Sequence, residues 1–197
     1  MLHSYVSRLF VFLALTLLAF NPSAKAQTNN SGFAVALIDM QEGFYARGGT
    51  TDSIGLKDLV RNQARLLTWA VQKKIPVVVF EYENYGKTDP RLIKIIANHQ
   101  YKVIEKNMDG AFDGKSDSES VSTLKAWNVD VLIVAGINGP YCVKSTIMGA
   151  LDAGFDVMTT SWVIGDINHN PPTFPSGSWM YGDSRLVVFP TLDSIIK

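Results

Sequence analysis

Cysteine and histidine are scarce in this chain. Its 197 residues include one cysteine, Cys142, and three histidines. A single cysteine cannot form an intramolecular disulfide. The histidines, His3, His99 and His169, lie on separate segments, and this excludes the closely spaced His and Cys ligands of a typical zinc site. We therefore expect a free thiol, no metal and no cofactor.

An excess of charge of one sign is also absent. Lysine plus arginine and aspartate plus glutamate each number 18, without a basic stripe or a charge run. This balance does not indicate a basic surface that would bind nucleic acid or an anionic membrane. No internal repeat or heptad pattern is present, and the length suits one domain with a full apolar core.

The N-terminus resembles a secretory signal peptide. Arg8 precedes an apolar stretch over residues 9–20, and residues 24–26 read Ala-Lys-Ala, a small-x-small cleavage pattern. The apolar stretch is short for a membrane span. We expect cleavage after residues 1–26, a mature domain over 27–197 without a membrane segment, and a periplasmic or secreted location. An uncleaved membrane anchor is the alternative.

The remaining sequence alternates between apolar strands and amphipathic helices. Continuous apolar strands separated by helices are typical of a parallel sheet covered on both faces. The pattern predicts an α/β fold, a three-layer α/β/α sandwich with a mostly parallel, Rossmann-like sheet of about six strands. The expected strands are 33–38, 76–80, 101–105, 130–135, 155–160 and 185–189, and the expected helices are 54–73, 91–98, 117–127 and 140–153.

Polar residues follow several of these strands. Asp39, Glu81 and Lys106 come directly after apolar runs, and the turn 136–142 leads from a strand into a helix. Ligands bind at the carboxyl ends of strands in such sheets. In the first helical turn, Cys142 would meet unpaired N–H groups and the helix dipole, so we expect a thiol pKa below the usual value of about 8.5. A small buried apolar role is the alternative.

Three segments resemble the isochorismatase-like cysteine hydrolases, which include nicotinamidases and related amidases. The first runs from 36 to 44 and reads ALIDMQEGF. The second joins VIEK, ending at Lys106, to Ala111 and Phe112, and the third runs from 134 to 143 and ends in YCV. Each segment stands at the end of an expected strand, in the order that the family has.

The resemblance implies a catalytic triad. Cys142 would be the nucleophile, Asp39 the base that takes its proton, and Lys106 the cation that holds Asp39. Backbone N–H groups of Asn138 and Cys142 would form the oxyanion hole. The family also carries a cis peptide bond, which maps onto Ile137–Asn138. Taken singly, Asp39 could cap a turn and Lys106 could be a solvated loop charge.

Several further residues are candidates for substrate contact. Gln41 and Phe44 could instead serve in packing, and the long aromatic segment 165–183 could wall the pocket or form the interface of a homo-oligomer. The full set is Gln41, Phe44, Glu81, Tyr82, Gly139, Trp162 and Trp179.

The chain departs from the family pattern at two places. Gly139 stands where many members have Thr, and Pro140 stiffens the turn. The nicotinamidase branch has metal-binding histidines after the second strand, where this chain has Glu81 and Glu83 and no histidine. These carboxylates could bind a hard cation or a substrate amine. A rival Cys-His dyad would need His169 close to the thiol.

We therefore predict an exported cysteine hydrolase that cleaves a C–N bond of a small amide or related acyl substrate through a thioester. The alternative is a non-catalytic binding or interaction protein that retains the fold.

Overall fold

The computed structural model describes residues 32–47, 54–166 and 183–197. The predicted signal peptide, His169 and Trp179 lie outside these ranges. None of the helices in the described ranges is long and apolar enough to cross a membrane.

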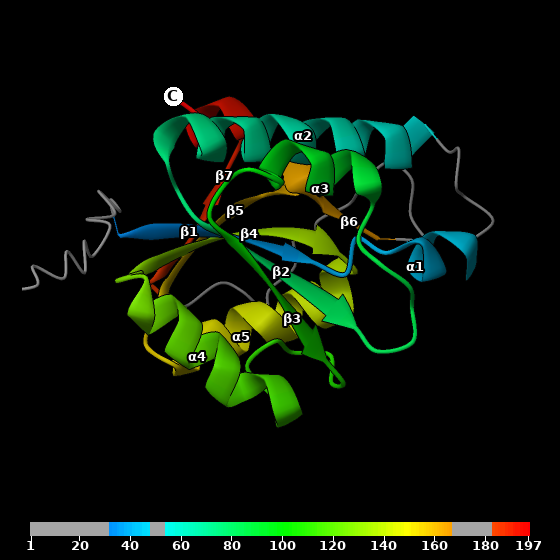
Figure 1. Cartoon of the computed structure of the whole chain (residues 1–197). Helices are drawn as coiled ribbons and strands as arrows, with labels where there is room; N and C mark the ends of the chain where they lie inside the picture. The colour runs from blue at the N-terminus through cyan, green and yellow to red at the C-terminus, as the bar shows by residue number, and fades with distance from the viewer. Residues whose placement is uncertain (1–31, 48–53, 167–182) are drawn as a thin grey trace, which may run out of the picture.

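A parallel β-sheet forms the centre of the molecule (Figure 1). Every described strand pair is parallel, as predicted. A further two-residue strand, β6 (Ile164–Gly165), pairs with β4 near its end. From edge to edge the described strands are β3 (Tyr101–Lys106), β2 (Val77–Tyr82), β1 (Phe33–Ile38), β4 (Val131–Ile137), β5 (Asp156–Thr160) and β7 (Leu186–Phe189).

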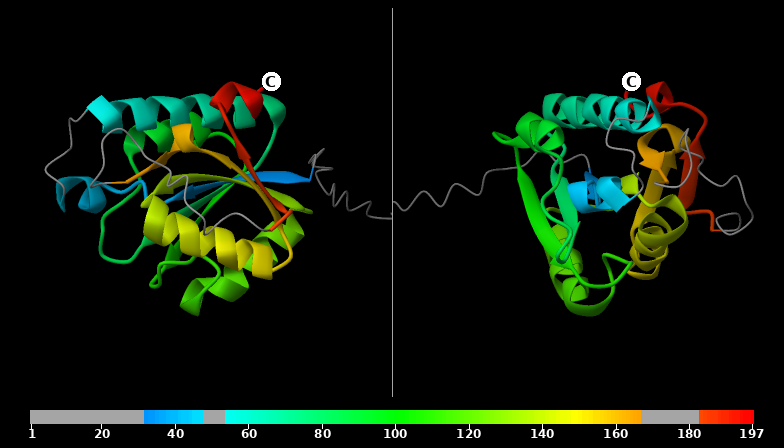
Figure 2. Two further views of the ribbon diagram at one scale, coloured as in Figure 1. Left: turned by 180° about the vertical axis from the view of Figure 1, so that it is seen from behind. Right: turned by 90° about the vertical axis from the view of Figure 1, so that its right-hand side faces the viewer.

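Helices cover both faces of the sheet, which confirms the predicted three-layer sandwich. The two views in Figure 2 place α2 and α3 on one face and α4 and α5 on the other, while α1 lies beyond the tip of β1. Their bounds are α1 (Glu42–Arg47), α2 (Ile54–Lys73), α3 (Pro90–Ile96), α4 (Asp117–Ala126) and α5 (Lys144–Asp152).

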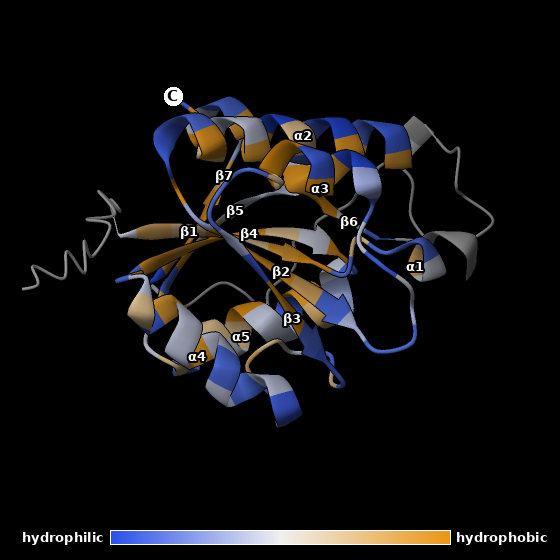
Figure 3. Ribbon diagram, viewed as in Figure 1, coloured by the Kyte–Doolittle hydropathy of each residue, from blue (hydrophilic) through white to orange (hydrophobic). Residues whose placement is uncertain are grey.

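Apolar burial explains this arrangement. The side chains of β1 from Ala34 to Ile38 are fully buried, as are those of β2 from Val77 to Phe80. Figure 3 shows the central strands as mostly hydrophobic and the helices as mixed. Strands that contact helices on both faces require such continuous apolar runs, and this is why the sequence identified them.

The strand order reverses between β1 and β4. From β1 the chain first adds β2 and β3 on one side, and later adds β4, β5 and β7 on the other. Sheets of this type open a crevice at the carboxyl ends of the two strands where the order reverses. Asp39 and the turn after β4 therefore lie at the point where the fold favours a ligand site.

Gly136 allows β4 to pass close to β1. Its φ is +142°, and an added Cβ would lie 2.2 Å from the carbonyl oxygen of Ile38. A larger residue cannot occupy this position without moving the backbone. The predicted strand end at 135 is wrong, because β4 continues through Gly136 to Ile137.

The helix expected over 140–153 is divided in two. A π-helical turn at Gly139–Val143 comes first, and α5 starts at Lys144. Asn138 accepts backbone hydrogen bonds from Tyr141 and Val143 at the start of this turn. Cys142 therefore lies in the π-helical turn before α5, in a geometry that often marks functional sites.

Candidate active site

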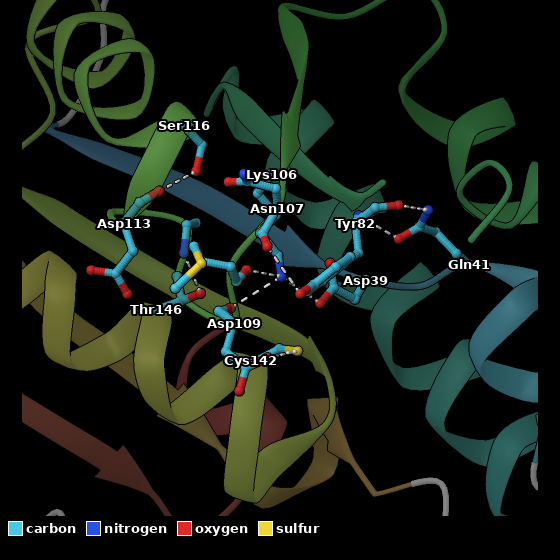
Figure 4. A network of polar contacts seen from close by, with 12 residues as sticks. Asp39, Gln41, Tyr82, Lys106, Asn107, Asp109, Asp113, Ser116, Cys142 and Thr146 are labelled. Carbon is cyan, nitrogen blue, oxygen red and sulfur yellow. Dashed lines mark hydrogen bonds and ion pairs between the residues drawn. The ribbon is translucent and has the colours of Figure 1, made fainter. Parts of the chain in front are cut away.

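Three strand ends bring the predicted triad together. Asp39 follows β1, Lys106 ends β3, and Cys142 lies in the turn after β4 (Figure 4). Because β2 separates β3 from β1, the side chain of Lys106 must cross the end of β2 to reach Asp39. It does so over Tyr82, whose ring centroid is 4.3 Å from the lysine Nζ.

Asp39 and Lys106 form a buried ion pair. Lys106 Nζ lies 2.8 Å from Asp39 Oδ2, and both side chains are fully buried. The lysine ammonium also donates to the carbonyl oxygens of Met108 at 3.0 Å and Asp109 at 3.1 Å. All three of its N–H donors therefore have a partner, which a buried ammonium group requires.

The backbone and the pKa of Asp39 are both unusual for an aspartate. Its φ is +52°, in the left-handed region that aspartate tolerates better than most residues. Burial raises the pKa of Asp39 to about 6, while Lys106 and the thiol of Cys142 act in the opposite direction. A carboxylate with this pKa is a stronger base than an ordinary aspartate and titrates close to neutral pH.

Cys142 is a buried free thiol, with 3% of its surface exposed. The peptide bond between Ile137 and Asn138 is cis, as the family resemblance predicted. The predicted lowering of the thiol pKa is wrong. Burial and the nearby carboxylate of Asp39 raise the pKa of Cys142, and Lys106 only partly offsets this. The thiol is therefore protonated in the free protein, and its proton must be removed during attack.

Gln41 ties the end of β1 to the loop after β2. Its Oε1 accepts a hydrogen bond from the backbone N–H of Tyr82 at 2.7 Å, and its Nε2 donates to the carbonyl oxygens of Tyr82 and Gly86. Both ends of the amide are occupied by backbone groups. These bonds position Tyr82, which fits the packing role that was the alternative for Gln41, and a contact of Gln41 with substrate stays a prediction.

Phe44 and Tyr82 belong to an aromatic group beside the triad. The rings of Phe44 and Tyr85 are stacked with centroids 4.2 Å apart, and Tyr82 meets each of them edge on. The Tyr82 hydroxyl donates to the carbonyl oxygen of Asn107. These contacts hold the Tyr82 ring against Lys106.

The carboxylate of Glu81 is engaged by neighbouring residues. Its side chain is 5% exposed, accepts hydrogen bonds from the N–H and hydroxyl groups of Thr88, and pairs with Lys87 at 2.9 Å. Glu83 pairs with Lys115, which also binds Glu105. In the described structure Glu81 therefore holds the loop after β2, and its contact with substrate stays a prediction.

These carboxylates do not fit the metal of the nicotinamidase branch. Glu81 and Glu83 are engaged by lysine and threonine groups and do not converge on a common point. Within the described ranges, no group of three His, Cys, Asp or Glu side chains could hold a metal ion. His99 lies elsewhere, with Nε2 2.6 Å from the carbonyl oxygen of Ile75, just before β2.

The other predicted substrate-contact residues in the described ranges, Gly139 and Trp162, lie in different parts of the structure. Gly139 begins the π-helical turn beside the thiol and is buried. Trp162 is half exposed, and its indole N–H donates to the carbonyl oxygen of Pro190 after β7. This hydrogen bond places Trp162 toward the β7 edge of the sheet.

Sequence reasoning missed one residue of the site. Asp109 follows Lys106 by three positions, and its Oδ1 accepts from the thiol of Cys142 at 3.8 Å. The signal was an acidic residue in the turn after β3, but nothing in the local sequence showed that this turn folds back over the thiol.

The fold and the site together define an α/β protein with a Cys, Asp and Lys constellation at the switch point of its sheet. Residues 33–170 match the family model of the isochorismatase domain. The chain therefore belongs to the isochorismatase family.

Three known proteins illustrate the likeness. A protein of Arabidopsis thaliana called a probable inactive nicotinamidase is 25% identical over 153 residues, which cover 64% of this chain and 76% of that protein. The MAR1 ribonuclease of Caenorhabditis elegans has a TM-score of 0.63 at 20% identity, with 86% of this chain and 80% of that chain covered. The octameric hydrolase YcaC of Escherichia coli has a TM-score of 0.56 at 23% identity, with 69% and 65% covered.

Proposed function

We propose that the protein is a cysteine hydrolase that cleaves the C–N bond of a small amide or related acyl substrate. The observation that carries this proposal is the convergence of Asp39, Lys106 and Cys142 from three strand ends, with the first two in a buried ion pair. Membership of the isochorismatase family supports hydrolysis in general. The particular bond and the roles of the residues are our inference from the site.

The first half of the reaction forms a thioester. Asp39 takes the thiol proton of Cys142 as the sulfur attacks the acyl carbon, because the raised pKa of the thiol disfavours a thiolate in the free protein. Lys106 keeps Asp39 ionised and oriented. Backbone N–H groups of Asn138 and Cys142 would stabilise the oxyanion. The amine leaves with the proton that Asp39 took up.

The second half regenerates the enzyme. A water molecule enters where the amine left, and Asp39 removes its proton as the oxygen attacks the thioester. The C–S bond breaks, the acid is released, and the proton returns to the sulfur of Cys142. One water is consumed for each amide cleaved, and no electron acceptor or metal takes part in a step.

The test is ammonia release by the purified protein from a panel of small primary amides. Wild-type protein should release ammonia from at least one member, and Cys142→Ala should lose at least about a thousandfold in rate. Cys142→Ser is the matched control, because serine is close to cysteine in size and replaces the thiol with a hydroxyl group, which is a weaker nucleophile. Equal ammonia release by wild-type protein and Cys142→Ala would exclude the mechanism.

A non-catalytic binding protein is the second candidate. Two observations favour it, since the thiol pKa is raised in the free protein and the Arabidopsis relative is called inactive. This candidate predicts saturable binding of a small molecule, measured by calorimetry, with no turnover. Binding should then survive Cys142→Ala.

Export and assembly are part of the proposal. Residues 1–26 have the composition of a cleaved signal, so the mature protein should be periplasmic or secreted and begin near Gln27. Half-exposed apolar side chains at Tyr141 and Met148, close to the thiol in the chain, support a homo-oligomer, and YcaC is an octamer. N-terminal sequencing of the exported protein and light scattering test the two points.

A further inference from the structure

Asp109 places a second carboxylate against the nucleophile. Its Oδ1 lies 3.8 Å from the sulfur of Cys142 (Figure 4). The thiol is buried, whereas Asp109 is exposed. An exposed carboxylate in contact with a buried thiol lies on the solvent side of it. A substrate whose acyl carbon reaches the sulfur therefore comes close to this charge.

The position of Asp109 is fixed by the triad itself. The ammonium group of Lys106 donates hydrogen bonds to the carbonyl oxygens of Met108 and Asp109, so the turn folds around it. Two residues later, the N–H of Ala111 donates to Thr146 Oγ1 on α5, at 3.1 Å. The carbonyl oxygen of Ala111 accepts from Ser120 Oγ on α4, at 2.6 Å. The turn is thus anchored on both sides of Asp109.

The charges around the thiol are unbalanced. Asp39 and Asp109 are two carboxylates beside the thiol, and the Lys106 ammonium pairs with the carboxylate of Asp39 but contacts Asp109 only through its backbone carbonyl in the hydrogen bonds of the described chain. Asp109 also faces Tyr82, because its charge helps burial to raise the pKa of that phenol. Such a site repels an anionic substrate and attracts a cation.

The lysines at the neighbouring strand ends do not offset this charge. Lys87 pairs with the buried Glu81, and Lys115 pairs with Glu83 and Glu105. Each cation is held by at least one acidic side chain. Asp39 adds a further feature, because its Oδ2 is held in the ion pair with Lys106 whereas its buried Oδ1 receives no hydrogen bond from the described residues. The site therefore keeps acceptor capacity for a ligand that brings N–H donors.

We infer that Asp109 selects cationic molecules at Cys142, and that the substrate is a small amide carrying a protonated amino group near its scissile carbonyl. The amide part of this inference rests on the proposed function. The substrate ammonium would donate a charge-assisted hydrogen bond to Asp109. Bound there, it would neutralise one of the two carboxylates that disfavour a thiolate, so that the correct substrate helps to activate the nucleophile.

Charge-matched labelling of the thiol tests the selection without any need for turnover. Because Cys142 is the one cysteine, 2-aminoethyl methanethiosulfonate and its anionic 2-sulfonatoethyl counterpart each report on one site. The ratio of the two rates in folded protein is divided by the same ratio in denatured protein. This normalised ratio should favour the cation in wild-type protein, and Asp109→Asn should lower it by about tenfold.

A matched control separates local from general charge. Asp117→Asn removes the same charge from the exposed first turn of α4, away from the thiol, and should leave the ratio within about twofold of wild type. A merely structural role of Asp109 would change both rates together and not their ratio. An unchanged ratio in Asp109→Asn would overturn the inference.

Turnover provides the second arm. Wild-type protein should prefer glycinamide, which is cationic, over the neutral propionamide and the anionic malonamate, and Asp109→Asn should reduce this preference by about tenfold. Turnover with no charge preference in either protein would overturn the inference. Charge-selective labelling without turnover of any amide would support the selection by Asp109 and refute the proposed hydrolase function.

Discussion

Lys106 Nζ lies 2.8 Å from Asp39 Oδ2, although β2 separates the strands that carry the two residues. The pair is fully buried and connects the base of the proposed reaction to the turn that carries Asp109. One lysine side chain thus organises both carboxylates that face the thiol.

Loss of Lys106 should destabilise the fold. Lys106→Met leaves Asp39 buried without a counter-charge, which costs about 3–5 kcal/mol, and adding Asp39→Asn should recover part of this loss. The control is Lys102→Met, which breaks an exposed pair with Glu119 and should cost less than about 1 kcal/mol. Urea denaturation gives the free energy of unfolding of wild type, the two single variants and the double variant. Equal stability of Lys106→Met and wild type would contradict a buried ion pair.

The pH dependence of turnover should report on Asp39. Because the carboxylate is the active form and its pKa is about 6, kcat/KM should fall as the pH drops through about 6. Lys106→Met should move this fall to higher pH, since the lysine charge holds the pKa down. Asp39→Asn should lose at least about a hundredfold in rate. A profile that does not shift in Lys106→Met would argue against Asp39 as the base.

The thiol of the free protein should react slowly at neutral pH. Burial and Asp39 raise its pKa, so alkylation by iodoacetamide should keep increasing beyond pH 9. The same protein unfolded in guanidinium chloride is the control and should follow an ordinary cysteine pKa of about 8.5. Rapid alkylation of folded protein at pH 7 would show instead that a thiolate exists before substrate binds.

Metal removal should have no effect. Glu81 and Glu83 are engaged by lysine and threonine groups, so the loop after β2 lacks the converging ligands of a tight transition-metal site. Excess EDTA should leave activity and melting temperature unchanged, and elemental analysis should find no stoichiometric zinc, iron or manganese. One tightly bound metal per chain, with activity lost on chelation, would refute this prediction.

The sequence predicted what depends on strands and their ends. β1 and β4 are buried on both faces, so their continuous apolar runs were visible, and the polar residues after them marked the edge where ligands bind. Asp39, Lys106 and Cys142 stood out because they lie at or after the ends of expected strands, and the family resemblance gave them the roles of a triad. The cis peptide at Ile137–Asn138 came from the resemblance alone.

The sequence did not predict what depends on tertiary contacts. Glu81 looked like a free carboxylate, but Thr88 and Lys87 fold back onto it. The thiol pKa was expected to be low from its place before a helix, but burial and neighbouring carboxylates have the larger effect. Asp109 meets Cys142 only because the turn wraps around Lys106, and no local pattern encodes that contact.

The most direct test of the mechanism is to trap the thioester. Wild-type protein mixed with a turned-over amide, quenched in acid within the first turnovers and measured by intact mass spectrometry, should gain the mass of the acyl group on Cys142. Hydroxylamine added before the quench should remove this mass as the hydroxamic acid, and Cys142→Ala should show neither the adduct nor turnover. Amide hydrolysis by Cys142→Ala at the wild-type rate, with no adduct on the wild-type protein, would contradict the account.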